Sequence, residues 1–223
     1  MNKTKIEWCD YTVNPIKGVC PNSCWYCYAR RMYKRFKWNP EIRLDLDCLD
    51  KIWNIKKPSR IFVGSMHEIF GDWISDSWIQ EIINRIKHCE KHIFIFLSKN
   101  PKRYYDFKFP SNCWLGVTIT GEEGYRTEEI YRYLYRKDNI RFISFEPILK
   151  LPYYFGKKMD WVIIGGLTGY KYDRPDSVIR GIIAWHRCEN VPIFIKPNLK
   201  WEEKIQEFPK IKEVKNEFRK KRY

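Results

Sequence analysis

Residues 92–97 read His92-Ile93-Phe94-Ile95-Phe96-Leu97, an almost unbroken apolar run of the length of one strand. Short continuous apolar runs are typical of strands that are buried on both faces, as in a parallel sheet. Six further runs of this type lie at residues 7–13, 60–64, 113–119, 140–144, 160–165 and 191–195. Helical patterns separate several of them, at residues 25–37, 76–89, 122–136 and 177–188. The alternation predicts an α/β fold, a partial or full (β/α) barrel with roughly seven parallel strands.

The helical pattern at residues 76–89 has both a start signal and an apolar face. Asp76 or Ser77 is of a type that caps a helix N-terminus. The residues expected on one face are Trp78, Ile82, Ile83 and Ile86. We see no composition break in the chain, so we expect one domain over residues 1–209. The basic stretch at residues 210–223 is expected to be a C-terminal helix or tail.

Composition restricts the class of protein. Hydrophobic residues make up 44% of the 223 residues, which argues against wholesale disorder. No stretch approaches the roughly 20 apolar residues that cross a bilayer. The first seven residues lack the apolar core of a signal peptide. We therefore expect a soluble, cytoplasmic protein with no membrane partner.

The chain is strongly basic. It has 42 Lys and Arg against 27 Asp and Glu, which gives a net charge of +15. Such a surplus indicates an anionic partner, and nucleic acid is the expected class. The alternative is a compositional bias in which Lys is simply the default surface residue, and charge alone does not separate the two.

Three of the eight cysteines crowd into one short loop. Cys20, Cys24 and Cys27 have the spacing Cys-x3-Cys-x2-Cys, and Tyr26 precedes the last of them. In a reducing compartment, such crowding indicates metal binding rather than disulfides. Three thiolates can hold three corners of an Fe4S4 cube and leave the fourth iron without a protein ligand. The loop follows the first predicted strand, where the active site of a barrel begins.

Other uses of these thiols are less consistent with the spacing. A zinc site usually takes four ligands, and the nearest fourth thiol, Cys9 or Cys48, has no matching spacing. A redox pair at Cys24 and Cys27 does not explain Cys20. The alternative function is a zinc-stabilised basic nucleic-acid-binding protein without catalysis. We expect the single cysteines to be small buried apolar residues, with Cys9 a remote candidate for a thiyl donor. They are Cys9, Cys48, Cys89, Cys113 and Cys188.

The cysteine loop resembles the signature of the radical S-adenosylmethionine (SAM) superfamily, in which an aromatic residue takes the position of Tyr26. The rest of the chain resembles one branch, a phage- and prokaryote-encoded family of unknown function. The matching segments extend over nearly the whole chain: 5–8, 14–15, 60–63 with 65–66, 97–99, 114–117, 144–147 and 160–166. Two features depart from that family, since the cysteine loop is shorter than usual and Leu167 replaces a Glu.

This resemblance implies an enzyme with two cofactors. Cys20, Cys24 and Cys27 would hold a [4Fe-4S] cluster whose open iron binds SAM. Reductive cleavage of SAM would give a 5′-deoxyadenosyl radical that abstracts hydrogen from a substrate. The substrate stays open, with nucleic acid as one candidate. A reducing electron donor is an expected partner, and the sequence does not indicate the number of subunits.

The remaining site residues are expected at the ends of the predicted strands, where polar groups point into the mouth of a barrel. The candidates for binding SAM are Tyr26, Ser65, Thr118, Glu146, Gly165 and Gly166, with Lys99 and Lys196 beside them. The alternatives are structural. The turn with Ser65 would be held by a satisfied His67, the glycines would form a tight turn, and Glu146 would pair with a lysine.

Overall fold

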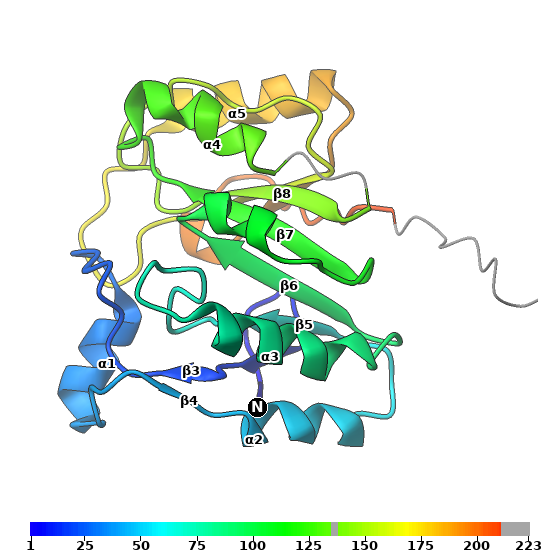
Figure 1. The fold of residues 1–223 in the computed structure, drawn as a ribbon. Helices are drawn as coiled ribbons and strands as arrows, with labels where there is room; N and C mark the ends of the chain where they lie inside the picture. Colours follow the sequence, from blue (N-terminus) through cyan, green and yellow to red (C-terminus); the bar gives the residue numbers. More distant parts are fainter. Residues whose placement is uncertain (135–137, 211–223) are drawn as a thin grey trace, which may run out of the picture.

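Figure 1 shows the computed structural model, which describes residues 1–134 and 138–210. The strands are β1 (Asn2–Lys3), β2 (Tyr11–Val13), β3 (Ile16–Lys17), β4 (Arg43–Leu44), β5 (Arg60–Val63), β6 (Ile93–Ser98), β7 (Cys113–Ile119), β8 (Ile140–Phe145), β9 (Trp161–Ile164) and β10 (Ile193–Ile195). The α-helices are α1 (Tyr28–Phe36), α2 (Asp47–Asp50), α3 (Asp76–Lys87), α4 (Thr127–Arg132) and α5 (Asp176–Cys188). Short 3-10 helices are η1 (Lys51–Asn54), η2 (Pro101–Asp106), η3 (Gly124–Arg126) and η4 (Pro197–Leu199).

The main sheet has eight strands in the order β1-β2-β5-β6-β7-β8-β9-β10 within the described residues. Every neighbouring pair from β2 to β10 is parallel, whereas β1 is antiparallel to β2. The strands β1 and β10 lie at opposite ends of this order, so the sheet is open between them, as in a partial and not a closed barrel. The predicted α/β fold with parallel strands is confirmed.

The outer face of the sheet packs against helices. Figure 1 shows α3 on one side of the molecule and α4 and α5 on the other, following the curve of the sheet. Ile82, Ile83 and Ile86 of α3 and Ile179 and Ile182 of α5 are buried in this outer core. Burying each such side chain stabilises the fold by about 1.5–3 kcal/mol.

The inner face has a second core at the amino ends of the strands. Its largest members are aromatic and come from five strands and the turn before β2: Trp8, Phe62, Trp114, Phe142, Trp161 and Phe194. The Trp161 ring stacks on Phe208, with 5.5 Å between the ring centroids. Its indole Nε1–H donates to the Glu207 carbonyl at 2.9 Å. The amino end of the partial barrel is therefore closed by aromatic packing.

All seven predicted runs contain a parallel strand, and their bounds differ mainly at the ends. The run at residues 7–13 contains β2 only from Tyr11, because residues 7 and 8 form a turn. The run at residues 191–195 gives β10 only from Ile193, since Pro192 has no backbone N–H to donate to a ladder.

The four predicted helical patterns also contain helices, with two corrections. Ser75, not Asp76 or Ser77, caps α3, and its hydroxyl accepts a hydrogen bond from the Trp78 backbone N–H at 3.4 Å. Ile79 is fully buried on the face of α3 where Trp78 was expected, and Trp78 is only half-buried. The other three residues predicted for this face, Ile82, Ile83 and Ile86, are buried as expected.

The basic helix or tail predicted for residues 210–223 lies, apart from Lys210, outside the described residues. The single domain over residues 1–209 stays a prediction. Among the described residues, no helix has both the length and the apolar character that a membrane span requires.

Candidate functional site

A cavity of about 570 Å³ opens at the carboxyl ends of the parallel strands. Its volume lies in the range of roughly 300–1,000 Å³ that is usual for sites of small ligands. Eight of the nine predicted site residues line it: Cys20, Cys24, Cys27, Tyr26, Ser65, Thr118, Glu146 and Gly166. The structure thus brings together residues that are up to 146 positions apart in the sequence.

The cysteine loop lies between β3 and the start of α1. The Cys27 backbone N–H donates to the Cys24 carbonyl at 3.0 Å, and α1 begins at the next residue. Arg30 on the first turn of α1 donates to the Cys20 carbonyl at 2.9 Å and to the Ser23 hydroxyl at 2.8 Å. The three thiols are free and half-buried. Helix α1 therefore fixes the shape of the loop that carries them.

His67 ties the cysteine loop to the turn after β5. Its Nδ1 lies 3.1 Å from the Gly18 carbonyl, and the Trp73 Nε1–H donates to its Nε2 at 3.1 Å. Since Nε2 accepts a hydrogen bond, we assign the proton to Nδ1, which donates to Gly18. Burial lowers the pKa of His67, in agreement with a neutral ring. Both ring nitrogens of His67 are therefore hydrogen-bonded, as the structural alternative for this turn expected.

The donor set of the loop fits an iron–sulfur cluster. All three cysteines line the large cavity and also a second hollow of about 20 Å³. Within residues 1–134 and 138–210, no three His, Cys, Asp or Glu side chains are close enough to hold a single metal ion. A cubane cluster instead takes one thiolate on each of three irons, so its ligands need not converge on one point. Burial raises the pKa of Cys20.

The turn after β5 is held by Asn14, which the sequence indicates only as part of the matching segment at residues 14–15. The Ser65 hydroxyl and the Met66 backbone N–H both donate to the Asn14 Oδ1 at 3.1 Å. The Tyr28 hydroxyl donates to the Ser65 carbonyl at 2.6 Å. Ser65 is therefore placed at the cavity wall by contacts from Asn14, directly after β2, and from α1.

Glu68 is a buried acid that the sequence did not indicate. Its carboxylate accepts hydrogen bonds from the Ser98 hydroxyl at 2.7 Å and the backbone N–H groups of Lys99 at 2.8 Å and Phe70 at 3.1 Å. Burial raises its pKa, and these three donors act in the opposite direction. The Lys99 ammonium donates to the Tyr26 hydroxyl at 2.9 Å. Lys99 thus links the end of β6 to the cysteine loop.

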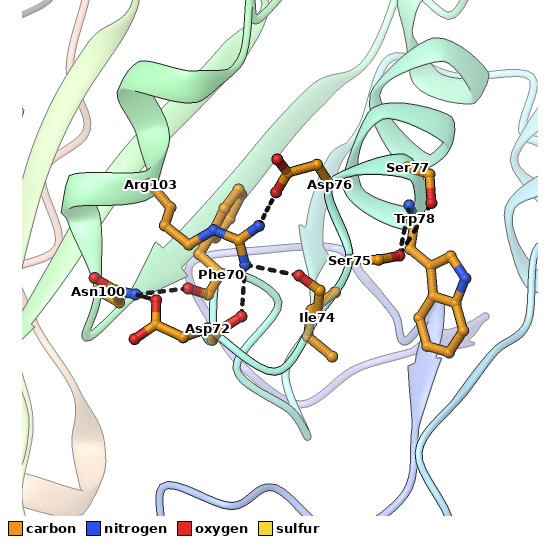
Figure 2. Close-up of polar contacts among 10 residues, drawn as sticks. Phe70, Asp72, Ile74, Ser75, Asp76, Ser77, Trp78, Asn100 and Arg103 are labelled. Atoms are coloured by element: carbon orange, nitrogen blue, oxygen red, sulfur yellow. Dashed lines mark hydrogen bonds and ion pairs between the residues drawn. The ribbon is translucent and has the colours of Figure 1, made fainter.

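Figure 2 shows the contacts that support the rest of this turn from η2. Arg103 donates to the Ile74 carbonyl at 2.9 Å and forms an ion pair with Asp76. Asn100 donates to the Phe70 carbonyl and to the Asp72 carboxylate, both at 2.9 Å. The long segment between β5 and α3 is therefore fixed over its whole length.

The opposite wall of the cavity carries an ion pair between Glu146, after β8, and Lys196, after β10. Asn198 in η4 donates to the Gly166 carbonyl at 2.7 Å and to the Thr168 hydroxyl at 3.0 Å. Nothing in the sequence pattern singles out Asn198, because a short 3-10 turn has no periodicity. The ion pair anticipated as an alternative does form, and it lies in the cavity.

The two predicted glycines allow close approach to other residues of the site. A Cβ at Gly165 would lie 2.7 Å from the carboxyl carbon of Glu146, and one at Gly166 would lie 2.8 Å from the Asn198 carbonyl oxygen. Gly165 is the one predicted site residue that does not line the cavity. It leaves room for Glu146. Leu167, which replaces a Glu of the resembling family, lines the cavity.

The loop after β9 is tied to α1 across the rim. Arg31 donates to the carbonyls of Gly169 at 3.1 Å and Thr168 at 2.9 Å. The Tyr170 hydroxyl donates to the Trp25 carbonyl at 2.9 Å. Figure 1 shows α1 and this yellow loop on the same side of the molecule. The cysteine loop is therefore held by the turn after β5 on one side and by the loop after β9 on the other.

The single cysteines are mostly as expected. Cys48, Cys89 and Cys113 are buried, and so is Cys9, whose pKa burial raises to about 12. Cys188 is exposed, so the expectation of burial is wrong for this residue. It lies at the last position of α5, on the side turned away from the outer core.

Comparisons with known proteins give a family and a fold. A family model described as "Protein of unknown function (DUF5131)" matches residues 3–221, so the chain belongs to that family. The chain is 28% identical over 137 residues to uncharacterized protein MJ0683 of Methanocaldococcus jannaschii, which covers 58% of this chain. It spans about half, 52%, of the length of that relative.

Two solved structures share the fold. Spore photoproduct lyase complexed with dinucleoside spore photoproduct has a TM-score of 0.57 and 14% identity, with 85% of this chain and 64% of that chain covered. A double mutant of the lyase, with bound AdoMet and dinucleoside spore photoproduct, has a TM-score of 0.56 and 13% identity, with 82% and 63% covered. This chain therefore spans slightly less than two thirds of the lyase.

Proposed function

We propose that this member of the DUF5131 family is a radical SAM enzyme, and that it acts on nucleic acid. In this proposal Cys20, Cys24 and Cys27 hold a [4Fe-4S] cluster, and SAM binds in the cavity beside them. The observation that carries the proposal is that the three free cysteines of a Cys-x3-Cys-x2-Cys loop line a cavity at the carboxyl end of a parallel partial barrel. The shared fold with a lyase solved with bound AdoMet supports it.

When bound, the cluster would supply one electron to SAM, which would split into methionine and a 5′-deoxyadenosyl radical able to abstract hydrogen from a substrate. The chain's own residues position the reactants and exclude water. The half-buried thiols leave one side of the loop open to the cavity. Ser65 and the backbone beside it offer hydrogen-bonding groups next to the loop, and Asn14 keeps them in place.

The far wall offers one charge of each sign. Glu146 and Lys196 both line the cavity, and their ion pair is only partly shielded from water. Such a pair matches the ammonium and carboxylate of an amino acid, or lets Lys196 meet an anionic substrate. Asn198 holds the glycine turn at a fixed distance from Glu146. Thr118 and Tyr26 complete the walls.

Charge supports nucleic acid as the substrate class. The net charge of +15 favours association with a polyanion. The lyase that shares this fold was solved in complex with dinucleoside spore photoproduct. The proposed chemistry also needs a reducing compartment and a reducing electron donor, for which the cytoplasm is suited. A phage origin stays a prediction.

The test is to purify the protein without oxygen, rebuild the cluster, and add dithionite and SAM. We expect about four iron atoms with matching sulfide per chain and release of 5′-deoxyadenosine. Cys188→Ala, which removes an exposed thiol outside the cavity, is the matched control for replacing Cys20, Cys24 and Cys27 by Ala. Zinc without sulfide and without cleavage of SAM would overturn the proposal and favour the zinc-stabilised binding protein.

A further inference from the structure

The charged residues of helix α1 are all basic. Arg30, Arg31, Lys34 and Arg35 lie within the helix, Lys37 is its C-cap, and all five side chains are exposed. Arg30 and Lys34 are four positions apart, as are Arg31 and Arg35, so the cations share one face of the helix. Like charges at this spacing destabilise a helix, and positive charge in the first turn is also opposed by the helix dipole. This face is therefore not built for the stability of the helix.

No carboxylate of residues 1–134 or 138–210 forms an ion pair with any of these five cations. Arg30 and Arg31 donate only to uncharged acceptors, in the cysteine loop and in the loop after β9. By contrast, Arg85 of α3, Arg132 of α4 and Arg180 of α5 each pair with a carboxylate. The positive charge of α1 is thus available to an anion from outside the chain.

Exposed aromatic residues lie at both ends of this basic face. Before the helix, the ring centroid of Trp25 lies 5.2 Å from that of Tyr170. After the helix, Phe36 stacks on Trp38, with 5.3 Å between the centroids and 22° between the ring planes. The four residues are 41–56% exposed, so about half of each surface is open to a ligand. The basic face of α1 and these two aromatic pairs are called the α1 strip below.

Cations and rings are in direct contact along the strip. The Arg31 guanidinium lies 4.8 Å from the centre of the Tyr170 ring, and the Arg35 guanidinium lies 5.4 Å from the centre of the Phe36 ring. Each end of the α1 strip therefore offers positive charge and an aromatic surface within the size of one nucleotide.

The α1 strip borders the cavity. Tyr28, Ala29 and Met32 line the cavity from the side of α1 that is turned away from Arg30 and Lys34. Helix α1 stands at the mouth of the cavity, where the parallel strands end, whereas the aromatic inner core forms the floor. A polymer bound on the strip would therefore lie along the rim of the mouth.

The chemistry of the strip restricts its partner. Surfaces that bind single strands combine positive charge for the phosphates with exposed rings on which unpaired bases stack. A duplex offers the same phosphates but keeps the faces of its bases stacked on each other. An acidic protein offers the charge without a series of flat bases. The combination on α1 therefore favours a single strand.

We propose that the α1 strip binds single-stranded nucleic acid, with phosphates at the cations and bases stacked on the exposed aromatic pairs. The inference rests on the proposed function and sharpens it, because it says which form of nucleic acid binds and along which surface it reaches the mouth of the cavity.

The test measures binding to the full chain with its cluster rebuilt, by fluorescence anisotropy over a range of salt concentrations. The probe is a labelled oligothymidine of about 12 nucleotides, a length that one single-strand binding domain can occupy. The comparison is a duplex of the same length. We expect the single strand to bind at least about tenfold more tightly than the duplex, because only its bases are free to stack.

The charge variant combines Lys34→Gln, Arg35→Gln and Lys37→Gln, three exposed cations that make no hydrogen bond to the cysteine loop among the described residues. We expect affinity for the single strand to fall at least about tenfold. The slope of log affinity against log salt should become shallower by about 2, since each phosphate contact of a single strand contributes about 0.7. The control removes three exposed lysines that precede β5 and β6, at the amino end of the barrel: Lys56, Lys57 and Lys91.

The aromatic variant is Trp38→Ala, and its matched control is Trp53→Ala, whose ring is exposed in η1 away from the strip. We expect Trp38→Ala to weaken binding of the single strand about fivefold to tenfold and to leave the salt slope unchanged, because a ring neutralises no phosphate. Phe36→Ala is a second variant with the same expectation. Circular dichroism and thermal unfolding establish that each variant is folded.

Three results would overturn the inference. The duplex could bind as tightly as the single strand, which would leave only phosphate contacts. The charge variant and its control could lose the same affinity, which would assign binding to net charge alone. Poly-glutamate with an equal number of charges could displace the probe as well as unlabelled oligothymidine does, which would favour an acidic protein as the partner. A failure of the proposed function would appear separately, as absence of iron, sulfide and 5′-deoxyadenosine in the wild-type protein.

Discussion

The inner face of the partial barrel has two halves that the same strands build with opposite chemistry. On β8, Phe142 lies in the aromatic floor, whereas Glu146 just beyond the strand lies at the mouth. On β10, Phe194 lies in the floor and Lys196 follows at the mouth. A shift of two to four residues along one strand thus separates a residue that holds the fold from one that faces a ligand.

This division agrees with how barrels separate stability from chemistry. Residues at the amino end of the strands pack against each other, and residues at the carboxyl end are supplied by loops that can vary. The loops of the mouth are therefore expected to determine activity, and the floor to determine the free energy of unfolding. Variants in each half test whether the two properties separate.

The largest effect is expected from the mouth. Replacing Cys20, Cys24 and Cys27 together by Ala should abolish iron binding and release of 5′-deoxyadenosine, because no thiolate remains to hold the cluster. The free energy of unfolding of the metal-free protein should change by less than about 1 kcal/mol, since half-buried loop residues contribute little. Iron analysis, product analysis and urea unfolding measure these quantities. Global unfolding of the triple variant would instead indicate a structural metal.

The next effect is expected from the floor. Trp161→Ala should lower the free energy of unfolding by about 3–5 kcal/mol, because it leaves a cavity among Trp114, Phe142 and Phe208. Urea unfolding of the metal-free protein gives the value. Trp53→Ala, in which the lost ring is 55% exposed, should change it by no more than about 0.5 kcal/mol. Equal losses for the two variants would contradict the distinction between floor and surface.

A smaller effect is expected from a positioning residue. Asn198→Ala removes the donors to Gly166 and Thr168, so the glycine turn is no longer fixed beside Glu146. We expect affinity for SAM to fall about tenfold, with a loss of stability near 1 kcal/mol. Calorimetric titration with SAM measures the affinity, and Asn39→Ala on the exposed loop before β4 is the control. Unchanged affinity would show that the turn needs no such support.

The smallest effect is a pH dependence. The folded pKa of His67 lies below its ordinary value of 6.5, because burial disfavours the charged ring. As pH falls below 6.5, the unfolded chain takes up a proton that folded His67 does not, so stability falls. His67→Gln should therefore lose less stability between about pH 7.5 and 5.5 than the wild-type protein. His92 and His186 shift in the same direction but are present in both proteins. Identical pH slopes would show that His67 is not the neutral anchor.

Local sequence patterns predicted the strands and much of the mouth. A parallel strand buried on both faces leaves a visible apolar run, and the polar residue at its end must then face the cavity or the solvent. This rule correctly placed Lys99, Thr118, Glu146 and Lys196 at the cavity. The cysteine loop was found because its ligands are close together in the chain.

The parts that were missed depend on contacts between distant segments. Asn198 in a short 3-10 helix holds the Gly166 turn, and Trp8 lines the cavity from a turn, and neither has a local pattern. Glu68 is buried by residues of β6 some 30 positions away. The contact between Arg31 and Gly169 joins residues 138 positions apart. Such docking follows from tertiary packing, which a single sequence does not display.

The central claim is that one iron of a cluster held by Cys20, Cys24 and Cys27 is open to the cavity. The most direct test is electron paramagnetic resonance of the rebuilt, dithionite-reduced protein with and without SAM. We expect a signal of a reduced [4Fe-4S] cluster that changes when SAM is added, in a sample that then releases 5′-deoxyadenosine. A cluster signal that SAM leaves unaltered, with no 5′-deoxyadenosine formed, would contradict the account.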